Sequence, residues 1–130
     1  MKATYPIIIH QADQTGYHFV EIPDFGGFTQ GKDLNDCLEM AQDYINLSVI
    51  DLEDHNVPIP PSSDINCLEI GPGQVKSLVA IDTISYRRAT NSRPVKKTLT
   101  IPSWLNKKAE QNNINFSQTL QEALINKLYQ

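Results

Sequence analysis

The stretch KKTLTIPSWL, residues 96–105, decides the fold of the last third of this chain. Its first six residues alternate in character, so Leu99 and Ile101 lie on one side of a strand. The opposite side carries side chains that can donate hydrogen bonds, namely Lys96, Thr98 and Thr100. The pattern therefore predicts a short basic strand with one apolar face and one hydrogen-bonding face.

Two helices are predicted to follow this strand. Pro102 stops the strand and suits the first turn of a helix. The apolar side of that helix consists of Trp104, Leu105 and Ala109. The Asn-rich turn at residues 112–115 can supply left-handed backbone positions. Ser117 is expected to cap a second helix through its side-chain oxygen. The inner stripe of the second helix consists of Leu120, Ala123, Leu124 and Leu128.

One strand and two helices in roughly 35 residues cannot bury their apolar faces alone. We therefore expect a homodimer in which two such strands pair antiparallel. The resulting ribbon fits the major groove of B-DNA, where Lys96, Thr98 and Thr100 would meet base edges. The free N–H groups at Ser117 and Gln118 would meet a phosphate. Residues 96–130 resemble the ribbon-helix-helix family in these features; a dimerisation module without DNA binding stays open as the alternative.

Charge is segregated along the chain. Residues 1–75 hold two Lys and twelve Asp or Glu, a net charge of −10, although the whole chain carries only −4. Residues 76–130 hold nine Lys or Arg against three acidic residues, a net charge of +6. This asymmetry predicts a nucleic-acid partner for the basic part and a basic partner for the acidic part.

The residues before the basic module predict an α+β domain over 1–86. Hydrophobic alternation and turn residues indicate a β-hairpin followed by two further strands. The four strands are expected at 4–12, 17–22, 28–32 and 75–84, the last of them buried on both faces. Tyr5, Tyr17 and Phe19 are assigned to the core or to strand pairing. The polar, arginine-rich residues 87–95 are predicted to be a linker to the module at 96–130.

A long helix is predicted between the third and fourth strands. Asp33 can cap its first turn, where the charge of Asp36 is also favourable, and His55 and Asn56 are expected to end it. Its apolar stripe is predicted to consist of Leu34, Cys37, Leu38, Ala41, Ile45, Ser48 and Leu52.

No cofactor or metal site is expected. Cys37 and Cys67 lie thirty positions apart without a neighbouring Cys or His at ligand spacing, which favours reduced thiols. Nothing places three or four carboxylates on adjoining strand centres, as two-metal nuclease chemistry would need, so we predict no enzyme activity. No run approaches the roughly 18 apolar residues of a membrane span, so a cytoplasmic protein that does not contact the membrane is expected.

The N-terminal motifs resemble the HicB antitoxin family over nearly the whole chain. They are YPIII at 5–9, GYHFVEIPDFGGFTQG at 16–31, an acidic helix, and IPPSS at 59–63, in this order. The resemblance implies a degenerate RNase-H-like sheet domain that binds and blocks a HicA-type toxin, which cleaves messenger RNA. It also implies repression of the protein's own operon through operator DNA. Whether dimers assemble into higher oligomers stays open.

Six residues are candidates for contact with the toxin. Asp24, Phe25 and Phe28 surround the Gly26–Gly27 turn and combine aromatic side chains with charge; core packing is the alternative for the aromatics. The electrostatic candidates on the helix are Asp36, Glu39 and Asp43. Two other functions stay open: a stand-alone ribbon-helix-helix transcription factor with a ligand-sensing N-terminal domain, and a metal-dependent ribonuclease.

Overall fold

The computed structural model describes residues 1–129 and divides the chain into two compact units, Met1–Ser92 and Arg93–Gln130. The two units are described separately. Among the described residues, no helix is long and apolar enough to cross a membrane.

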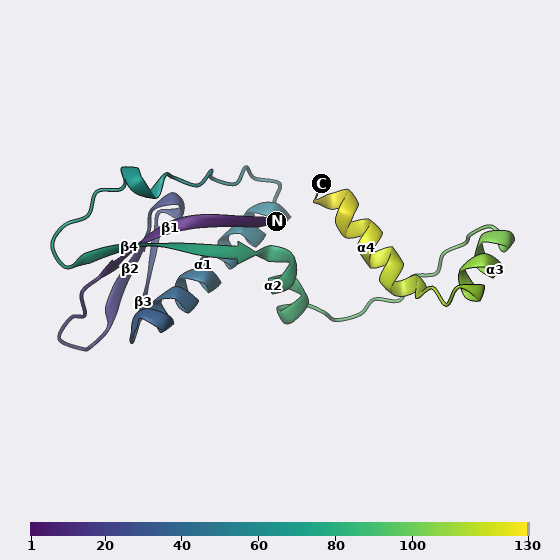
Figure 1. The fold of residues 1–130 in the computed structure, drawn as a ribbon, viewed down its shortest axis with the longest axis horizontal. Helices are drawn as coiled ribbons and strands as arrows, with labels where there is room; N and C mark the ends of the chain where they lie inside the picture. Colours follow the sequence, from purple (N-terminus) through teal and green to yellow (C-terminus); the bar gives the residue numbers. More distant parts are fainter. Residues whose placement is uncertain (130) are drawn as a thin grey trace. The chain divides into compact units, whose positions relative to one another are not determined.

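The first unit is a four-stranded antiparallel sheet with one long helix on one face (Figure 1). The sheet has the order β3-β2-β1-β4. Its strands are β1 (Lys2–His10), β2 (His18–Ile22), β3 (Gly27–Gly31) and β4 (Gln74–Asp82). The helices are α1 (Leu34–Asp54), α2 (Thr83–Thr90) and the 3-10 turns η1 (Pro23–Phe25) and η2 (Ile65–Cys67). The α+β class and all four predicted strands are thus confirmed, with ends shifted by up to two residues.

The core lies between α1 and the face of the sheet that it covers, here called the inner face. The sheet contributes Tyr5, Ile7, Ile9, Val20, Ile22, Val79 and Ile81, and α1 contributes Cys37, Ala41, Ile45 and Val49. Each fully buried isoleucine contributes about 1.5–3 kcal/mol. The predicted stripe was therefore partly wrong: Val49 is buried, whereas Leu34 is 58% exposed.

Both ends of α1 lie where the sequence predicts. The carboxylate of Asp33 accepts a 2.8 Å hydrogen bond from the N–H of Asp36, and the helix ends before His55. Asn56 then adopts a left-handed φ of 54°. Gly31 is required just before the helix, because a Cβ atom there would lie 2.5 Å from the backbone nitrogen of Cys37. This close approach holds the start of α1 against β3.

Pro6 lies in the middle of β1, at a point where its missing N–H costs nothing. β1 pairs with β2 at Ile8–Glu21, and the same register carried on would put Pro6 opposite Pro23, where β2 has ended. The connector between α1 and β4 occupies this gap, since Ser62 donates a 2.6 Å hydrogen bond to the carbonyl of Thr4.

The structure corrects two predictions near β4. Only alternate residues of this strand are buried, because it is an edge strand: Val79 is 4% exposed, whereas Leu78 is 51% exposed. The predicted linker is also partly helical, because Arg87 and the three residues after it belong to α2. The carboxylate of Asp82 caps this helix by accepting a 3.1 Å hydrogen bond from the N–H of Ser85.

The second unit consists of α3 (Ser103–Gln111) and α4 (Phe116–Leu128) (Figure 1). Asn113, in the turn between them, has a left-handed φ of 54°, as predicted. The predicted cap was wrong: Asn115 accepts the hydrogen bond from the N–H of Gln118, and Ser117 lies inside the helix. Residues 91–102 form no strand in this single chain, so the paired ribbon stays a prediction.

Candidate functional site

One side of α1 carries three of the candidate carboxylates. Asp36, Glu39 and Asp43 are spaced i, i+3 and i+7, which places them on one side of the helix. Asp36 accepts a 2.8 Å hydrogen bond from the backbone N–H of Lys32, and Asp43 accepts one of 2.6 Å from the hydroxyl of Tyr86. Glu39 is exposed. Two of these charges are thus held by short hydrogen bonds, whereas Glu39 accepts only a long one of 3.4 Å, from the side-chain amide of Asn35.

Asp24 and Phe25 lie elsewhere, at the turn after β2. The carboxylate of Asp24 accepts hydrogen bonds from both the backbone N–H and the hydroxyl of Ser63. Phe25 packs edge-on against Tyr5, with ring centroids 4.9 Å apart. Burial, and secondarily the charge of Asp24, raise the pKa of Tyr5. Phe25 is therefore largely a packing residue, and Asp24 anchors the connector.

A pocket of about 340 Å³ opens beside these two residues. It is lined by Asp24, Phe25, Ser48, Asp51, Leu52 and Pro60. Two carboxylates and a serine thus share its wall with three apolar residues, so the pocket is a mainly apolar hollow with hydrogen-bond acceptors at its wall.

Phe28 lies on the face of the sheet away from α1, here called the outer face. Its ring is 66% exposed and lies 5.3 Å from that of Phe19, which in turn lies 5.1 Å from His10. The imidazole of His10 lies 2.9 Å from the carboxylate of Glu21. Of the two roles predicted for Phe19, strand pairing is confirmed, because Phe19 lies opposite Gln30 of β3; it is not a core residue, since it is 41% exposed. Phe19, Phe28 and His10 come together through the register of β1, β2 and β3, which local sequence patterns do not reveal.

The six candidate residues therefore do not form one continuous site. The side chain of Phe28 projects from the outer face of the sheet, whereas α1, which carries Glu39, covers the inner face. The sheet therefore lies between Phe28 and Glu39. Asp24 and Phe25 form a third group at the end of β2.

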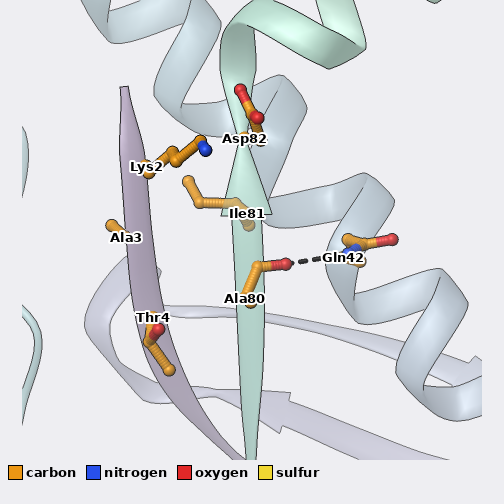
Figure 2. Close-up of a pocket in the computed structure, with 7 residues that line it drawn as sticks. All are labelled: Lys2, Ala3, Thr4, Gln42, Ala80, Ile81 and Asp82. Carbon is orange, nitrogen blue, oxygen red and sulfur yellow. Dashed lines mark hydrogen bonds between the residues drawn. The ribbon is translucent and has the colours of Figure 1, made fainter.

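A second pocket, of about 430 Å³, lies at the β4 edge of the sheet (Figure 2). Its lining residues are Lys2, Ala3, Thr4, Gln42, Ala80, Ile81 and Asp82. Figure 2 shows Gln42 reaching from α1 to β4, where its amide donates a 2.8 Å hydrogen bond to the carbonyl of Ala80. Sequence reasoning missed Gln42, since no local pattern indicates which helical residue faces a strand edge.

In the second unit, the predicted DNA contacts are all exposed. They are Lys96, Thr98, Thr100, Ser117 and Gln118. The N–H of Gln118 is already bound by Asn115 at 3.0 Å, so it is not available to a phosphate as predicted.

The apolar side chains of the second unit are also uncovered. Trp104 is 66% exposed, and neither α3 nor α4 buries a residue. The other exposed large apolar residues are Val95, Leu99, Ile101, Leu105, Ile114, Phe116, Leu124, Leu128 and Tyr129. Exposed patches of this kind mark interaction surfaces.

Charge follows the division into units. Residues 1–92 hold five Lys or Arg against thirteen Asp or Glu, a net −8, and the remainder holds six against two, a net +4. Within residues 1–129, no group of three or more His, Cys, Asp or Glu side chains could hold a metal ion.

Comparison with known proteins places this sheet domain and basic helical unit among the antitoxins of bacterial toxin–antitoxin systems. A family model described as a HicB-like antitoxin of a bacterial toxin-antitoxin system matches residues 5–127. The chain belongs to this HicB-like antitoxin family.

Two solved structures are similar to this chain. One is a toxin–antitoxin complex from Streptococcus pneumoniae, with 31% identity, a TM-score of 0.62, and coverage of 98% of this chain and 99% of that one. The other is the antitoxin HicB of Burkholderia pseudomallei, with 22% identity, a TM-score of 0.55, and coverage of 95% and 96%. The second likeness concerns the fold alone. No curated protein matches the chain.

Proposed function

We propose that the first unit binds and inhibits a HicA-type, messenger-RNA-cleaving toxin, and that the second unit dimerises and represses the operon by binding operator DNA. The observation that carries this proposal is the separation of charge by unit, −8 in the first and +4 in the second. A protein that handles RNA is expected to be basic, so an acidic inhibitor gains association rate and specificity from complementary charge.

The toxin partner is also supported by a relative. The structure that is 31% identical to this chain is that of a toxin–antitoxin complex. The proposed contacts remain the six candidate residues. Glu39 and Phe28 are the exposed members with the weakest ties to the rest of the chain, a 3.4 Å hydrogen bond from Asn35 and a ring contact with Phe19. Asp24, Phe25, Asp36 and Asp43 are held by shorter hydrogen bonds or by packing. We further propose that this domain, within residues 1–86, derives from an RNase-H-like fold without enzyme activity.

The homodimer rests on the uncovered apolar residues of α3 and α4. A second copy would supply both a strand partner for residues 98–101 and a cover for Trp104 and its neighbours. Pairing would leave Lys96, Thr98 and Thr100 on the outer side of the ribbon, available to base edges. The protein would act in the cytoplasm, where operator and messenger RNA are found.

Toxin inhibition is tested by producing the full chain with the product of the reading frame beside its gene. We expect the two proteins to co-purify and the full chain to restore growth of cells that express the toxin. An absence of both binding and rescue would overturn the inhibitory role.

Operator binding is tested with the triple variant Lys96→Ala, Thr98→Ala, Thr100→Ala. We expect loss of binding to DNA from upstream of the operon, with toxin rescue retained. The double variant Lys107→Ala, Lys108→Ala is a control that removes positive charge from α3 instead, and it should keep most of the affinity. Binding by the wild type should weaken steeply with salt. Simultaneous loss of rescue in the triple variant would contradict the division of labour between units.

A further inference from the structure

The outer edge of β4 is the feature from which we draw a further inference. We propose that this edge binds an extended, basic segment of the toxin as an added antiparallel or parallel strand. The inference rests on the proposed function, because it names the surface by which the first unit holds its partner.

The direction of the backbone groups along β4 follows from two hydrogen bonds. Met1 and Thr83 continue the register of β1 and β4, and the N–H of Thr83 donates to the carbonyl of Met1 at 2.9 Å. The N–H and carbonyl groups of the odd-numbered residues of β4 therefore point toward β1. The carbonyl of Ala80 instead accepts from Gln42 on α1. The N–H and carbonyl groups of Lys76, Leu78 and Ala80 therefore point away from β1, along the free edge.

This edge is long and largely unprotected. β4 has nine residues and contains no proline. Within residues 1–129, its outward backbone groups are engaged at two places: the N–H of Gln74 donates to the carbonyl of Gly71 at 3.2 Å, and the carbonyl of Ala80 accepts from Gln42. Lys76 is the kind of residue that guards an edge. Its ammonium group, however, donates to the carbonyls of Ile65 and Leu68 at 2.9 and 3.1 Å and so is held beside η2. A row of unpaired backbone groups is a template for another strand.

The charges beside this edge favour a basic partner. Gln42 brings α1 next to β4, and Glu39 and Asp43 lie one turn before and one residue after it. Asp82 stands at the end of the strand, where Lys2 is its cross-strand neighbour. The acidic groups beside the edge are therefore opposed by Lys2 and by the engaged Lys76. Two arginines follow on α2, Arg87 and Arg88, and Arg87 is already paired with Glu53 and Asp54 of α1.

A second copy of this chain is a poorer occupant. Pairing of β4 with β4 of another copy would bring two units of net charge −8 together, with their Glu39 and Asp43 carboxylates on neighbouring helices. Like charges across an interface are unfavourable. A positively charged strand meets the same groups favourably.

The pocket in Figure 2 gives the added strand a place for a side chain. Its volume of about 430 Å³ lies directly beside Ala80 and Gln42, at the same edge. In strand addition, backbone hydrogen bonds supply affinity, and pockets for alternate side chains supply specificity. Asp82, and the carboxamide of Gln42, could receive a lysine or arginine head there.

The test uses three variants of the full chain, mixed with the purified toxin from the neighbouring reading frame. Leu78→Pro removes an N–H that points out of the sheet, a position where an edge strand tolerates proline. Leu78→Ala removes only the side chain. Gln30→Pro is the matched control, on β3 at the opposite edge of the sheet. Phe19 and Gln30 form a non-hydrogen-bonded pair, so the N–H of Gln30 points out of the sheet and its loss breaks no bond to β2.

We expect Leu78→Pro to weaken toxin binding by about tenfold or more relative to Leu78→Ala, and Gln30→Pro to bind like the wild type. Equal binding by Leu78→Pro and Leu78→Ala would overturn the inference while leaving toxin inhibition intact. If the wild-type chain does not bind the toxin, the proposed function itself fails.

Amide exchange of the wild type provides a measurement that needs no substitution. In the free protein, the amides of Lys76, Leu78 and Ala80 should exchange quickly, and those of Val79 and Ile81 slowly. Toxin binding should slow the first group. Protection of the same amides by increasing the concentration of this chain alone would instead indicate pairing between copies and overturn the inference.

Discussion

The hydroxyl of Tyr86 donates a 2.6 Å hydrogen bond to the carboxylate of Asp43, which joins α2 to the acidic side of α1. The bond to this carboxylate raises the pKa of Tyr86, so the hydroxyl keeps its proton at all physiological pH values. One of the charges proposed to face the toxin is therefore held in place by a residue 43 positions away in the sequence.

Tyr86→Phe should destabilise the first unit. Loss of this hydrogen bond is expected to lower the free energy of unfolding by about 1 kcal/mol, measured by urea denaturation. Tyr17→Phe serves as the control, since the hydroxyl of Tyr17 makes no hydrogen bond within residues 1–129. Similar losses in both variants would show that the Tyr86–Asp43 bond has no particular role.

The double variant Glu39→Gln, Asp43→Asn should bind the toxin more slowly. Both changes keep the side-chain shape and remove charge, so the association rate is expected to fall several-fold at low salt and to approach that of the wild type at high salt. Stopped-flow fluorescence at several salt concentrations would measure it. Glu110→Gln with Glu122→Gln removes the same charge from the second unit, and an equal slowing by this pair would mean that only net charge matters.

Asp82→Ala should reveal a pH-dependent contribution to stability. The N–H of Ser85 holds the pKa of Asp82 below its ordinary value of 3.8. Because the folded-state pKa is depressed, the stabilisation is complete above the unfolded value and is lost as the pH falls through the folded value. At pH 7 the variant should lose about 1 kcal/mol, as expected for a helix cap. Urea denaturation at pH 3 should give a smaller difference; an unchanged difference would exclude ionisation of Asp82 as its cause.

The cap of α4 can be tested directly, because two neighbouring residues compete for the role. Asn115→Ala should lower the stability of the second unit by about 1 kcal/mol, since it removes the acceptor for the N–H of Gln118. Ser117→Ala should change it little. Circular dichroism during urea denaturation, at one fixed protein concentration, compares the two, and the opposite ranking would restore Ser117 as the cap.

Local signals in the sequence were read correctly, because they depend on neighbours a few residues away. Asp33 could be identified as a cap and His55–Asn56 as a helix end, since each requires only a side chain and the adjoining turn. Ser117 was the exception. Asn115 and Ser117 are both residue types that cap helices well, and they lie only two positions apart, so the sequence alone did not decide between them.

Properties that depend on the order of strands could not be predicted in this way. Leu78 belongs to a run of apolar residues typical of a buried strand, yet β4 lies at the sheet edge, and three of its nine residues, Leu78 among them, are exposed. The same limit applies to Phe28 and Glu39. Their separation by the sheet appears only once the order β3-β2-β1-β4 is known.

The bare apolar side chains of α3 and α4 have a consequence for when the protein can act. A surface that includes Trp104 and Leu128 is stabilised by anything that covers it, so the stability of the second unit is tied by mass action to the abundance of its cover. With a second copy as the cover, the fraction of competent chains falls on dilution. DNA binding by the second unit would then depend on the protein's own concentration. The proposed dimer would bind DNA when the chain is abundant and dissociate from it when the concentration falls.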